Sequence, residues 1–317
     1  MKLYMYTLIF FLLFVPDSPL HSQPTSTIEI GTFNIRFFPC NQDSQMMRDY
    51  NIIMRYPPEG GPTDTTMLFD ILRDLDIEVL AVQEIVDPPL FAEMAKRHLG
   101  DNFEFIYAPS NAWQKIGILY DKTEVKLIGE PVIYWELALE KPDRHRPALG
   151  AYFKTIPDGF DFHVIVVHLK ASPRGLPERQ KQWTYLEKIL ERLPGEEPQD
   201  KDIILLGDFN NVSQEGFEEF LPTIKNINYT WIGANDSTYT TSYWMPDWQK
   251  QELERSAIDQ IFISDDAGEE YIKASVKIGG ICTEGRNWIR GEFPDYYENI
   301  SDHCPVFVSF HRMPDND

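Results

Sequence analysis

The chain has 317 residues, of which 43% are hydrophobic, and this suffices for one large domain or two small ones. Its formal net charge of −21 excludes a general role in coating nucleic acid, because such a field repels polyanions at long range. A locally basic or cation-bearing cleft can still bind one phosphodiester. Three cysteines are too few for a disulfide-built scaffold, and the sequence leaves open whether any pair of Cys40, Cys282 and Cys304 forms a bridge.

The N-terminal segment is predicted to be a secretory signal peptide covering residues 1–22. Lys2 provides the positive end, an apolar run extends from Leu3 to Val15, and a proline-containing breaker precedes Ser22. A membrane anchor is the alternative, but the run is shorter than the ~20 apolar residues that a spanning helix needs. We therefore expect a secreted or periplasmic protein without a stable membrane span. Residues 23–317 are expected to form one domain, because no repeat or low-complexity linker divides them.

The predicted elements alternate between strands and a few helices. Ile28–Asn34 alternates like a strand and stops at a polar residue, and Thr63 or Asp64 can cap a helix that continues to about Leu75. Ile77–Gln83 is short and apolar enough for a buried strand that ends at Glu84. A helix is predicted from about Pro177 to Leu193. Later strands are predicted at Lys115–Tyr120, Ala151–Thr155, Phe162–His168, Ile203–Leu206, Ile258–Ile263 and Val306–Phe310. This order predicts packed sheets with helices outside.

Polar groups recur at the ends of these apolar strands. They are Asn34, Glu84, His168, Asp208 with Asn210, Asp259 inside its strand, and Asp302 with His303 just before the last strand. Each alone has an ordinary explanation, such as a turn residue, a helix cap or a buried core imidazole. Together they match what phosphoester hydrolysis requires, which is charge neutralisation, an aligned water and a route for protons.

The same residues lie in motifs that resemble those of the endonuclease/exonuclease/phosphatase superfamily. The motifs are Phe33-Asn34-Ile35-Arg36, Val82-Gln83-Glu84, His168-Leu169-Lys170, Gly207-Asp208-Phe209-Asn210, Ile258-Asp259 and Ser301-Asp302-His303-Cys304-Pro305-Val306. The first motif looks particularly like that of deoxyribonuclease I. The resemblance implies an α/β fold with two packed, mainly antiparallel β-sheets flanked by helices, which is a four-layer α/β sandwich.

The resemblance also implies a metal site and a water site. Glu84 would bind the divalent cation, with Asn34 and Asp302 close to it. Mg²⁺ is the expected cation, with Mn²⁺ or Ca²⁺ as alternatives, and the sequence leaves one metal or two open. Asp208 and Asn210 would orient the attacking water and a phosphate oxygen.

Further residues would handle protons and substrate. His303, paired with Asp259, and His168 would act in proton transfer and in stabilising the pentavalent charge, and which imidazole is the acid stays open. Arg146 resembles the arginine that reaches a substrate phosphate, a task that guanidinium suits, although an ordinary surface charge is the alternative. Lys170 adjoins His168 and is interpreted as a substrate contact.

These features predict a metal-dependent phosphodiesterase, with a nuclease acting on DNA or RNA as the first hypothesis. A lipid headgroup or small phosphoester is the alternative substrate, and the net charge of −21 favours it over long polyanions. Arg36 stands where family members that act at abasic sites have an acidic residue, which argues against a repair activity. A third hypothesis, a catalytically silent binding module, has no support because no motif position is lost. The sequence shows no obligate protein partner.

Overall fold

The computed structural model describes residues 26–41, 62–157, 159–196, 198–211, 214–233, 239–247, 249–250, 252–313 and 315. The predicted signal peptide, residues 1–22, lies outside these ranges. In the part of the chain that they cover, no helix is both long and apolar enough to cross a membrane.

Two six-stranded sheets form the centre of the molecule. The first has the strand order β13-β15-β1-β2-β4-β3. Its strands are β1 (Thr27–Phe38), β2 (Val79–Ile85), β3 (Phe103–Tyr107), β4 (Lys115–Asp121), β13 (Lys277–Ile278) and β15 (Val306–His311). Only the β1–β2 pair is parallel among the pairs described in this sheet.

The second sheet has the order β5-β6-β7-β8-β12-β9. Its strands are β5 (Val125–Tyr134), β6 (Ala148–Thr155), β7 (Asp161–His168), β8 (Ile203–Asp208), β9 (Tyr229–Trp231) and β12 (Asp259–Ser264). Its β7–β8 pair is parallel and its other described pairs are antiparallel. A small third sheet, which the sequence did not predict, consists of β10 (Ser242–Trp244), β11 (Glu252–Ser256) and β14 (Trp288–Ile289).

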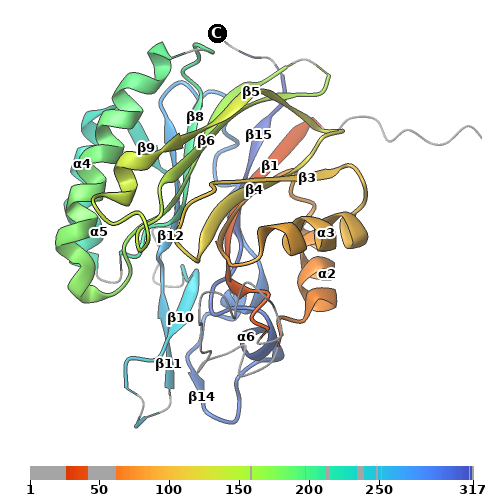
Figure 1. The fold of residues 1–317 in the computed structure, drawn as a ribbon, viewed down its shortest axis with the longest axis vertical. Helices are drawn as coiled ribbons and strands as arrows, with labels where there is room; N and C mark the ends of the chain where they lie inside the picture. The colour runs from red at the N-terminus through yellow and green to blue at the C-terminus, as the bar shows by residue number, and fades with distance from the viewer. Residues whose placement is uncertain are drawn as a thin grey trace, which may run out of the picture.

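Helices cover the outer faces of the two large sheets (Figure 1). The α-helices are α2 (Thr65–Leu75), α3 (Pro88–Leu99), α4 (Leu176–Arg192), α5 (Gln214–Asn226) and α6 (Asp295–Asn299). Short 3₁₀ helices are η1 (Trp135–Ala138), η2 (Pro173–Gly175), η3 (Leu193–Gly195) and η4 (Gly280–Glu284). Figure 1 shows α2 and α3 on one flank and α4 and α5 on the other.

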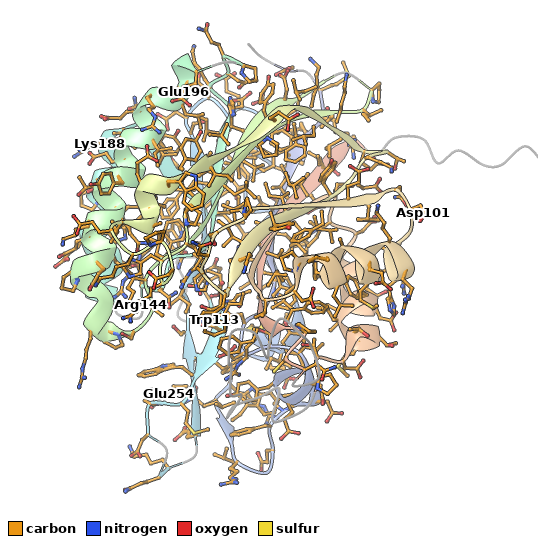
Figure 2. All side chains as sticks on the ribbon, viewed as in Figure 1. Asp101, Trp113, Arg144, Lys188, Glu196 and Glu254 are labelled. Carbon is orange, nitrogen blue, oxygen red and sulfur yellow. A yellow bond between two sulfur atoms is a disulfide. The ribbon has the colours of Figure 1, made fainter. Side chains whose placement is uncertain are left out.

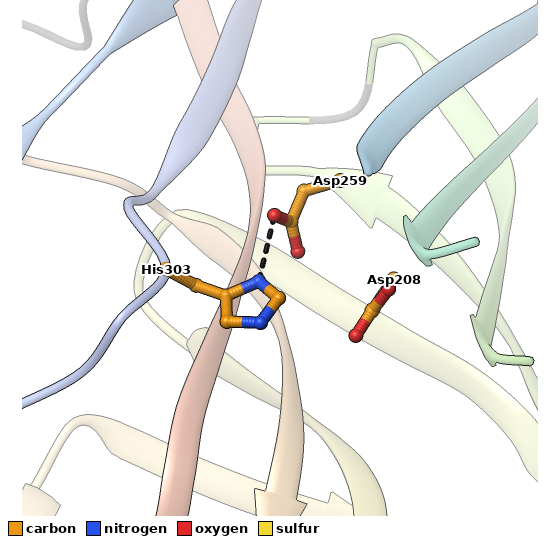
Figure 3. Close-up of side chains that lie close together, drawn as sticks. All are labelled: Asp208, Asp259 and His303. Carbon is orange, nitrogen blue, oxygen red and sulfur yellow. Dashed lines mark hydrogen bonds and ion pairs between the residues drawn. The ribbon is translucent and has the colours of Figure 1, made fainter. Parts of the chain in front are cut away.

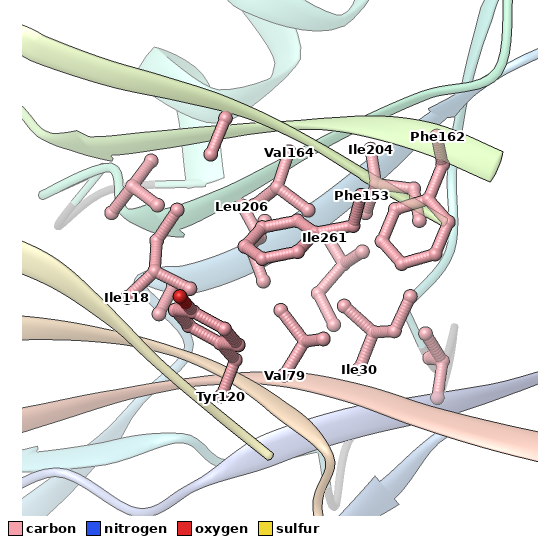
Figure 4. Packing of buried hydrophobic residues seen from close by; sticks show 14 of the residues in the cluster. Ile30, Val79, Ile118, Tyr120, Phe153, Phe162, Val164, Ile204, Leu206 and Ile261 are labelled. Atoms are coloured by element: carbon pink, nitrogen blue, oxygen red, sulfur yellow. The ribbon is translucent and has the colours of Figure 1, made fainter. Parts of the chain in front are cut away.

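Three buried clusters hold these layers together. The cluster between the sheets brings Ile30 and Val79 of the first sheet against Leu206 and Ile261 of the second (Figure 4). A second cluster, which includes Phe91, lies between the first sheet and α2 and α3. A third, with residues from α4 and α5, covers the second sheet. The order helix, sheet, sheet, helix confirms the predicted four-layer sandwich with mainly antiparallel sheets.

Strand alternation directs the polar strand ends into the space between the sheets. Side chains two residues apart in a strand point to the same face. Asn34 therefore shares the inner face with Ile30, and Asp208 shares it with Leu206. The same alternation carries His168 at the end of β7 to the inner face. One end of the sandwich consequently has a polar interior.

Most predicted elements are present with small shifts in their bounds. Asp64, one of the two proposed caps, accepts from the backbone N–H of Met67 at 2.9 Å at the start of α2. The prediction that the first strand stops at Asn34 is wrong, because β1 continues to Phe38. The continuation carries an irregularity in its pairing with β2, which polar composition alone does not signal.

Candidate active site

Three neighbouring strands of the second sheet align three predicted catalytic side chains. His168 is paired with Asp208 across β7 and β8, and Asp208 is paired with Asp259 across β8 and β12. Each of the three residues is at most 2% exposed. His168 Nε2 lies 3.4 Å from Asp208 Oδ2. Strand pairing alone thus places an imidazole and two carboxylates in a buried row.

The loop before β15 adds a second imidazole to this row. His303 Nδ1 lies 2.8 Å from Asp259 Oδ2, and Figure 3 shows the ring facing the carboxylates of both Asp259 and Asp208. The N–H of His303 donates to Ser301 Oγ at 3.0 Å. Ser301 Oγ donates in turn to the carbonyl oxygen of Asn34 at 2.7 Å. The loop therefore fixes His303 between the two sheets.

Glu84 reaches the site because its backbone leaves the regular strand conformation. Alternation after Gln83, which faces inward, would turn Glu84 to the outer face. Its φ is instead 62°, and the β2–β4 register shifts between Val82 and Ile85. Glu84 Oε1 lies 3.8 Å from His168 Nε2. Its second oxygen, Oε2, is buried and has no hydrogen-bond partner among the described residues.

Asn34 connects the first sheet to the buried row of the second. Its Nδ2 donates to Asp208 Oδ2 at 3.1 Å, and its Oδ1 accepts from the N–H of Arg36 at 3.1 Å. Arg36 Nη1 lies 3.4 Å from Asp302 Oδ2. Asp302 raises the pKa of Glu84 by its charge, and the side chain of Asn34 opposes this rise.

Arg146 and Asn210 converge on one backbone carbonyl next to the row. Arg146 Nη2 and Asn210 Nδ2 donate to the carbonyl oxygen of Leu169 at 2.9 and 3.1 Å. The N–H of Asn210 also donates to Asp208 Oδ1 at 2.8 Å. Arg146 is only 7% exposed, and the carboxylates of Glu84 and Asp208 act on its charge. Arg146 is therefore not the ordinary surface charge that the sequence left as an alternative.

Lys170 lies at the rim of the site. It is half-buried, and its Nζ donates to the carbonyl oxygen of Ala171 at 3.2 Å. Burial and then the charge of Arg146 lower the pKa of Lys170. Lys170 is thus near Arg146 without a described contact to the buried carboxylates.

The two imidazoles differ in charge because their neighbours differ. Burial, followed by the positive charges of Arg146 and His303, holds the pKa of His168 well below its ordinary value. Burial also lowers the pKa of His303, but the carboxylate of Asp259 and its hydrogen bond outweigh burial, and the pKa rises to about 10. At neutral pH, His168 is therefore neutral and His303 is an imidazolium.

Two carboxylates of the site hold protons more tightly than usual. Burial raises the pKa of Asp208 to about 7, while the charge of His303 opposes this rise. Burial, followed by the charge of Asp302, raises the pKa of Glu84. A carboxylate that titrates near pH 7 is suited to accept a proton from water.

The residues around Glu84 fit a divalent cation. The buried, unpartnered oxygen of Glu84 requires a counter-charge, and Asp302 and Asn34 add further oxygen atoms of the kind that Mg²⁺ prefers. Asp208, Asp259 and His303 form a second group, whose potential ligand atoms all lie within 4.8 Å of one another. The imidazolium charge of His303 disfavours a cation there, because a metal needs a neutral imidazole.

This sandwich, with carboxylates, imidazoles and an arginine at one end, defines a phosphoester hydrolase of the deoxyribonuclease I-like fold. The model of the endonuclease/exonuclease/phosphatase family matches residues 31–303, and the chain belongs to that family. No curated protein matches this chain.

Several solved structures share the fold at low sequence identity. TDP2 of D. rerio complexed with a single-strand DNA product has a TM-score of 0.60 and 18% identity, covering 90% of this chain and 99% of TDP2. A mannosyl-6-phosphatase of Bacteroides thetaiotaomicron has a TM-score of 0.56 and 16% identity, with coverages of 89% and 98%. The human Nocturnin catalytic domain has a TM-score of 0.53 and 16% identity, with coverages of 90% and 94%.

The structure brings all ten predicted site residues to one end of the sandwich, and their individual roles stay predictions. It also adds residues that the sequence did not assign to the site. Arg36 is one of them, and its spacing of two from Asn34 indicates that both side chains lie on the same strand face. Ser301 lies in a quoted motif without a role assigned to it, whereas Gln114 has no sequence signal, because it acts through one hydrogen bond to a distant segment.

Proposed function

We propose that the chain is an exported, divalent metal-dependent phosphodiesterase that hydrolyses nucleic-acid phosphodiester bonds. One observation carries the proposal, namely the convergence of five groups at one end of the sandwich. They are an unpartnered oxygen of Glu84, the carboxylate of Asp208 with its pKa raised to about 7, the guanidinium of Arg146, and two imidazoles of opposite protonation. The predicted signal segment supports export.

Each group then has a chemical task. Asp208 takes the proton of the attacking water, and Asn210, fixed to Asp208 and to the Leu169 carbonyl, directs a phosphoryl oxygen. Arg146 binds the substrate phosphate through its fork of donors. The imidazolium of His303, held by Asp259, supplies the proton for the leaving oxygen.

The remaining site residues stabilise the charge of the phosphoryl group and of the cation. Neutral His168 donates a hydrogen bond to a phosphoryl oxygen, and Glu84, Asp302 and Asn34 would hold the cation. Mg²⁺, or Mn²⁺ or Ca²⁺ in its place, would neutralise charge that develops on the phosphoryl group.

An aromatic pair at the edge of the site supports nucleic acid as the substrate. The rings of Phe37 and Trp113 stack with centroids 5.2 Å apart and an interplanar angle of 14°. Phe37 follows Arg36, and Trp113 precedes Gln114, whose Oε1 accepts from Arg146 Nη1 at 3.4 Å. Figure 2 shows Trp113 at the end of the sandwich from which β10 and β11 extend. Exposed parts of such rings can stack on bases without sequence preference.

Plasmid DNA and single-stranded RNA test this proposal directly. We expect the purified chain to nick or degrade them with Mg²⁺, and we expect a chelator or the Asp208→Ala variant to abolish cleavage. Nucleic acid that stays intact after prolonged exposure to the wild-type chain and Mg²⁺ would reject the nuclease.

The second candidate is a hydrolase of a lipid headgroup or small phosphoester. The net charge of −21 favours such substrates over long polyanions, and a mannosyl-6-phosphatase shares the fold. Release of phosphocholine from sphingomyelin, or of inorganic phosphate from phosphoinositides or sugar phosphates, would support it, provided that Asp208→Ala abolishes the release.

A further inference from the structure

A pocket outside the buried catalytic row lies between α4 and the loop that follows η1. Its volume is about 490 Å³, which is within the range of small-molecule sites. Its walls include Leu139, Lys141 and His145 from the loop and Glu178, Lys181 and Tyr185 from α4. The three helix residues lie on one face of α4, because their spacing of three and four follows the helical repeat.

Both walls adjoin the catalytic centre through residues next in sequence. On the loop wall, His145 precedes Arg146, whose guanidinium donates to the carbonyl that precedes Lys170 at 2.9 Å. On the helix wall, Arg179 Nη1 donates to the carbonyl of Lys170 at 2.7 Å, and Gln182 Oε1 accepts from the N–H of Lys170 at 2.9 Å. Arg146 and Lys170, the two residues assigned to the substrate phosphate, do not line the pocket but lie directly behind its walls.

At the end of the pocket next to Arg146, the lining residue His145 lies within the field of the positive charges of Arg146 and Lys170. His145 is 4% exposed, and burial followed by the charges of Arg146 and Lys170 lowers its pKa. The ring is therefore neutral, and its buried Nδ1 has no hydrogen-bond partner among the described residues. The lining also has three carboxylates, from Glu178 on α4 and from Glu136 and Glu140 on the opposite wall.

The outer part of the pocket offers an aromatic ring. Tyr185 lies one turn beyond Lys181 on α4 and is 40% exposed. Lys188 Nζ lies 5.6 Å from the centre of its ring. The wall thus combines a π-face with carboxylate acceptors and ammonium donors, which a phosphate alone would not require.

We propose that this pocket binds a nucleoside of the substrate, on the side of Arg146 and Lys170 away from the buried row. A nucleoside is uncharged and has an aromatic base for Tyr185 together with hydroxyl and ring donors and acceptors for Glu178 and Lys181. Arg146 and Lys170 hold the attached phosphate. The inference rests on the proposed nuclease function and adds to it the part of the substrate beside the scissile phosphate.

Three chromogenic phosphodiesters isolate the contribution of the nucleoside. Thymidine 5′-(p-nitrophenyl phosphate) and thymidine 3′-(p-nitrophenyl phosphate) carry a nucleoside on one side, whereas methyl p-nitrophenyl phosphate carries none. We expect the wild-type chain with Mg²⁺ to prefer one thymidine ester over the methyl ester in kcat/KM by about 5- to 100-fold, the range expected for stacking of one base. Tyr185→Leu should remove most of this ratio, and Lys181→Met should reduce it.

The control is Thr184→Ala, an exposed change on α4 outside the pocket lining, which should keep the wild-type ratio. The nucleoside pocket would be overturned if the methyl ester had the same kcat/KM as both thymidine esters, or if Tyr185→Leu left the ratio unchanged. Either result would leave the proposed phosphodiesterase activity intact. No hydrolysis of any of the three esters, together with intact plasmid, would instead reject the proposed function. If Tyr185→Leu impairs hydrolysis of mannose 6-phosphate but of none of the three esters, the pocket binds a hexose, and the nucleoside proposal is wrong.

Discussion

Asp208 lies between two imidazoles that have opposite protonation at neutral pH. His168 is 3.4 Å away on the neighbouring strand and is surrounded by positive groups, whereas His303 is hydrogen-bonded to Asp259 at 2.8 Å. Pairs of titratable groups whose environments separate their pKa values divide acid and base roles between them. The charge of His303 consequently depends on one carboxylate, Asp259.

Replacing Asp259 with Asn tests that dependence. We expect Asp259→Asn to lower the pKa of His303 and to reduce kcat by about 10²- to 10⁴-fold, because the amide keeps the shape but removes the charge that stabilises the imidazolium. NMR titration of His303 and kcat on methyl p-nitrophenyl phosphate measure the two effects. Asp266→Asn, a change in a half-exposed carboxylate, is the control. An unchanged His303 pKa would contradict the prediction.

Glu84→Gln separates metal binding from stability. Loss of the charge should raise the Mg²⁺ concentration needed for half-maximal activity by at least about 10- to 100-fold. The metal-free variant should unfold at a higher temperature than the metal-free wild type at pH 8, because burial and Asp302 raise the pKa of Glu84 and make its ionised form unfavourable. Activity titrations with Mg²⁺ and thermal unfolding in a chelator check both. A metal-free variant less stable than the wild type would be evidence against an unfavourable buried charge.

Residue alternation explains which site residues the sequence could indicate. Asn34 and Asp208 follow the period of two from apolar residues of the inner core, so their direction could be anticipated. Glu84 does not follow it, and its position depends on a left-handed backbone and a register shift. Such a local conformation depends on the neighbouring strand. The motif therefore predicted Glu84 as a site residue, but the sequence did not show how its side chain reaches the site.

At the scale of elements, the short loop that carries His303 is fixed by bonds to several other segments. Besides the Ser301 bonds, the carbonyl of His303 accepts from the Tyr296 hydroxyl at 2.8 Å, and the N–H of Cys304 donates to the Thr241 carbonyl at 2.7 Å. A disulfide joins Cys304 to Cys282 in η4, at a sequence separation of 22. The bridge thus couples η4 to the residue next to His303.

Removing the bridge should therefore destabilise the protein. We expect the double change of Cys282 and Cys304 to Ala to lower the free energy of unfolding by about 3 kcal/mol, mainly because the unfolded chain gains freedom. Guanidinium chloride unfolding with and without reductant measures this. Reductant should shift the wild type toward the variant and leave the variant unchanged. Equal midpoints for oxidised wild type and variant would disprove a stabilising bridge.

Periodic elements were predictable, whereas the pieces that shape the pocket were not. The helix predicted from Pro177 to Leu193 is α4, shifted by one residue, because its apolar spacing decides the face that packs on the sheet. The loop wall of the pocket, around Leu139 and His145, has no period. Its form depends on turns such as the left-handed backbone at Leu139, where φ is 53°. The disulfide pairing was likewise set by tertiary proximity.

At the scale of the whole molecule, ion pairs of a buried arginine connect the two sheets at the end of the sandwich opposite the active site. Arg312 lies just after β15, and its Nη2 is 2.7 Å from Glu124 and 3.5 Å from Glu78. Its Nε donates to the carbonyl of Thr27 at 2.7 Å, at the start of β1. Because Glu124 precedes β5 of the second sheet, one guanidinium connects both sheets. The same strands end in the active site, so their opposite ends carry two separate buried charge clusters.

The charge cluster around Arg312 should make stability depend on pH. Burial raises the pKa of Glu78 to about 7 from an ordinary value of 4.5, so the folded state binds more protons than the unfolded state between these values. The contribution of Glu78 to stability is full below about pH 4.5 and is lost as pH rises through 7, by about 3 kcal/mol at most. The unfolding free energy of Glu78→Gln should therefore decrease less between pH 5 and 8 than that of the wild type. Denaturant titrations at intervals of about one pH unit measure this difference. The control is Glu93→Gln, a change in an exposed carboxylate of α3, which should keep the wild-type dependence of unfolding free energy on pH. If Glu78→Gln showed that same dependence, Glu78 would not hold its proton in the folded state.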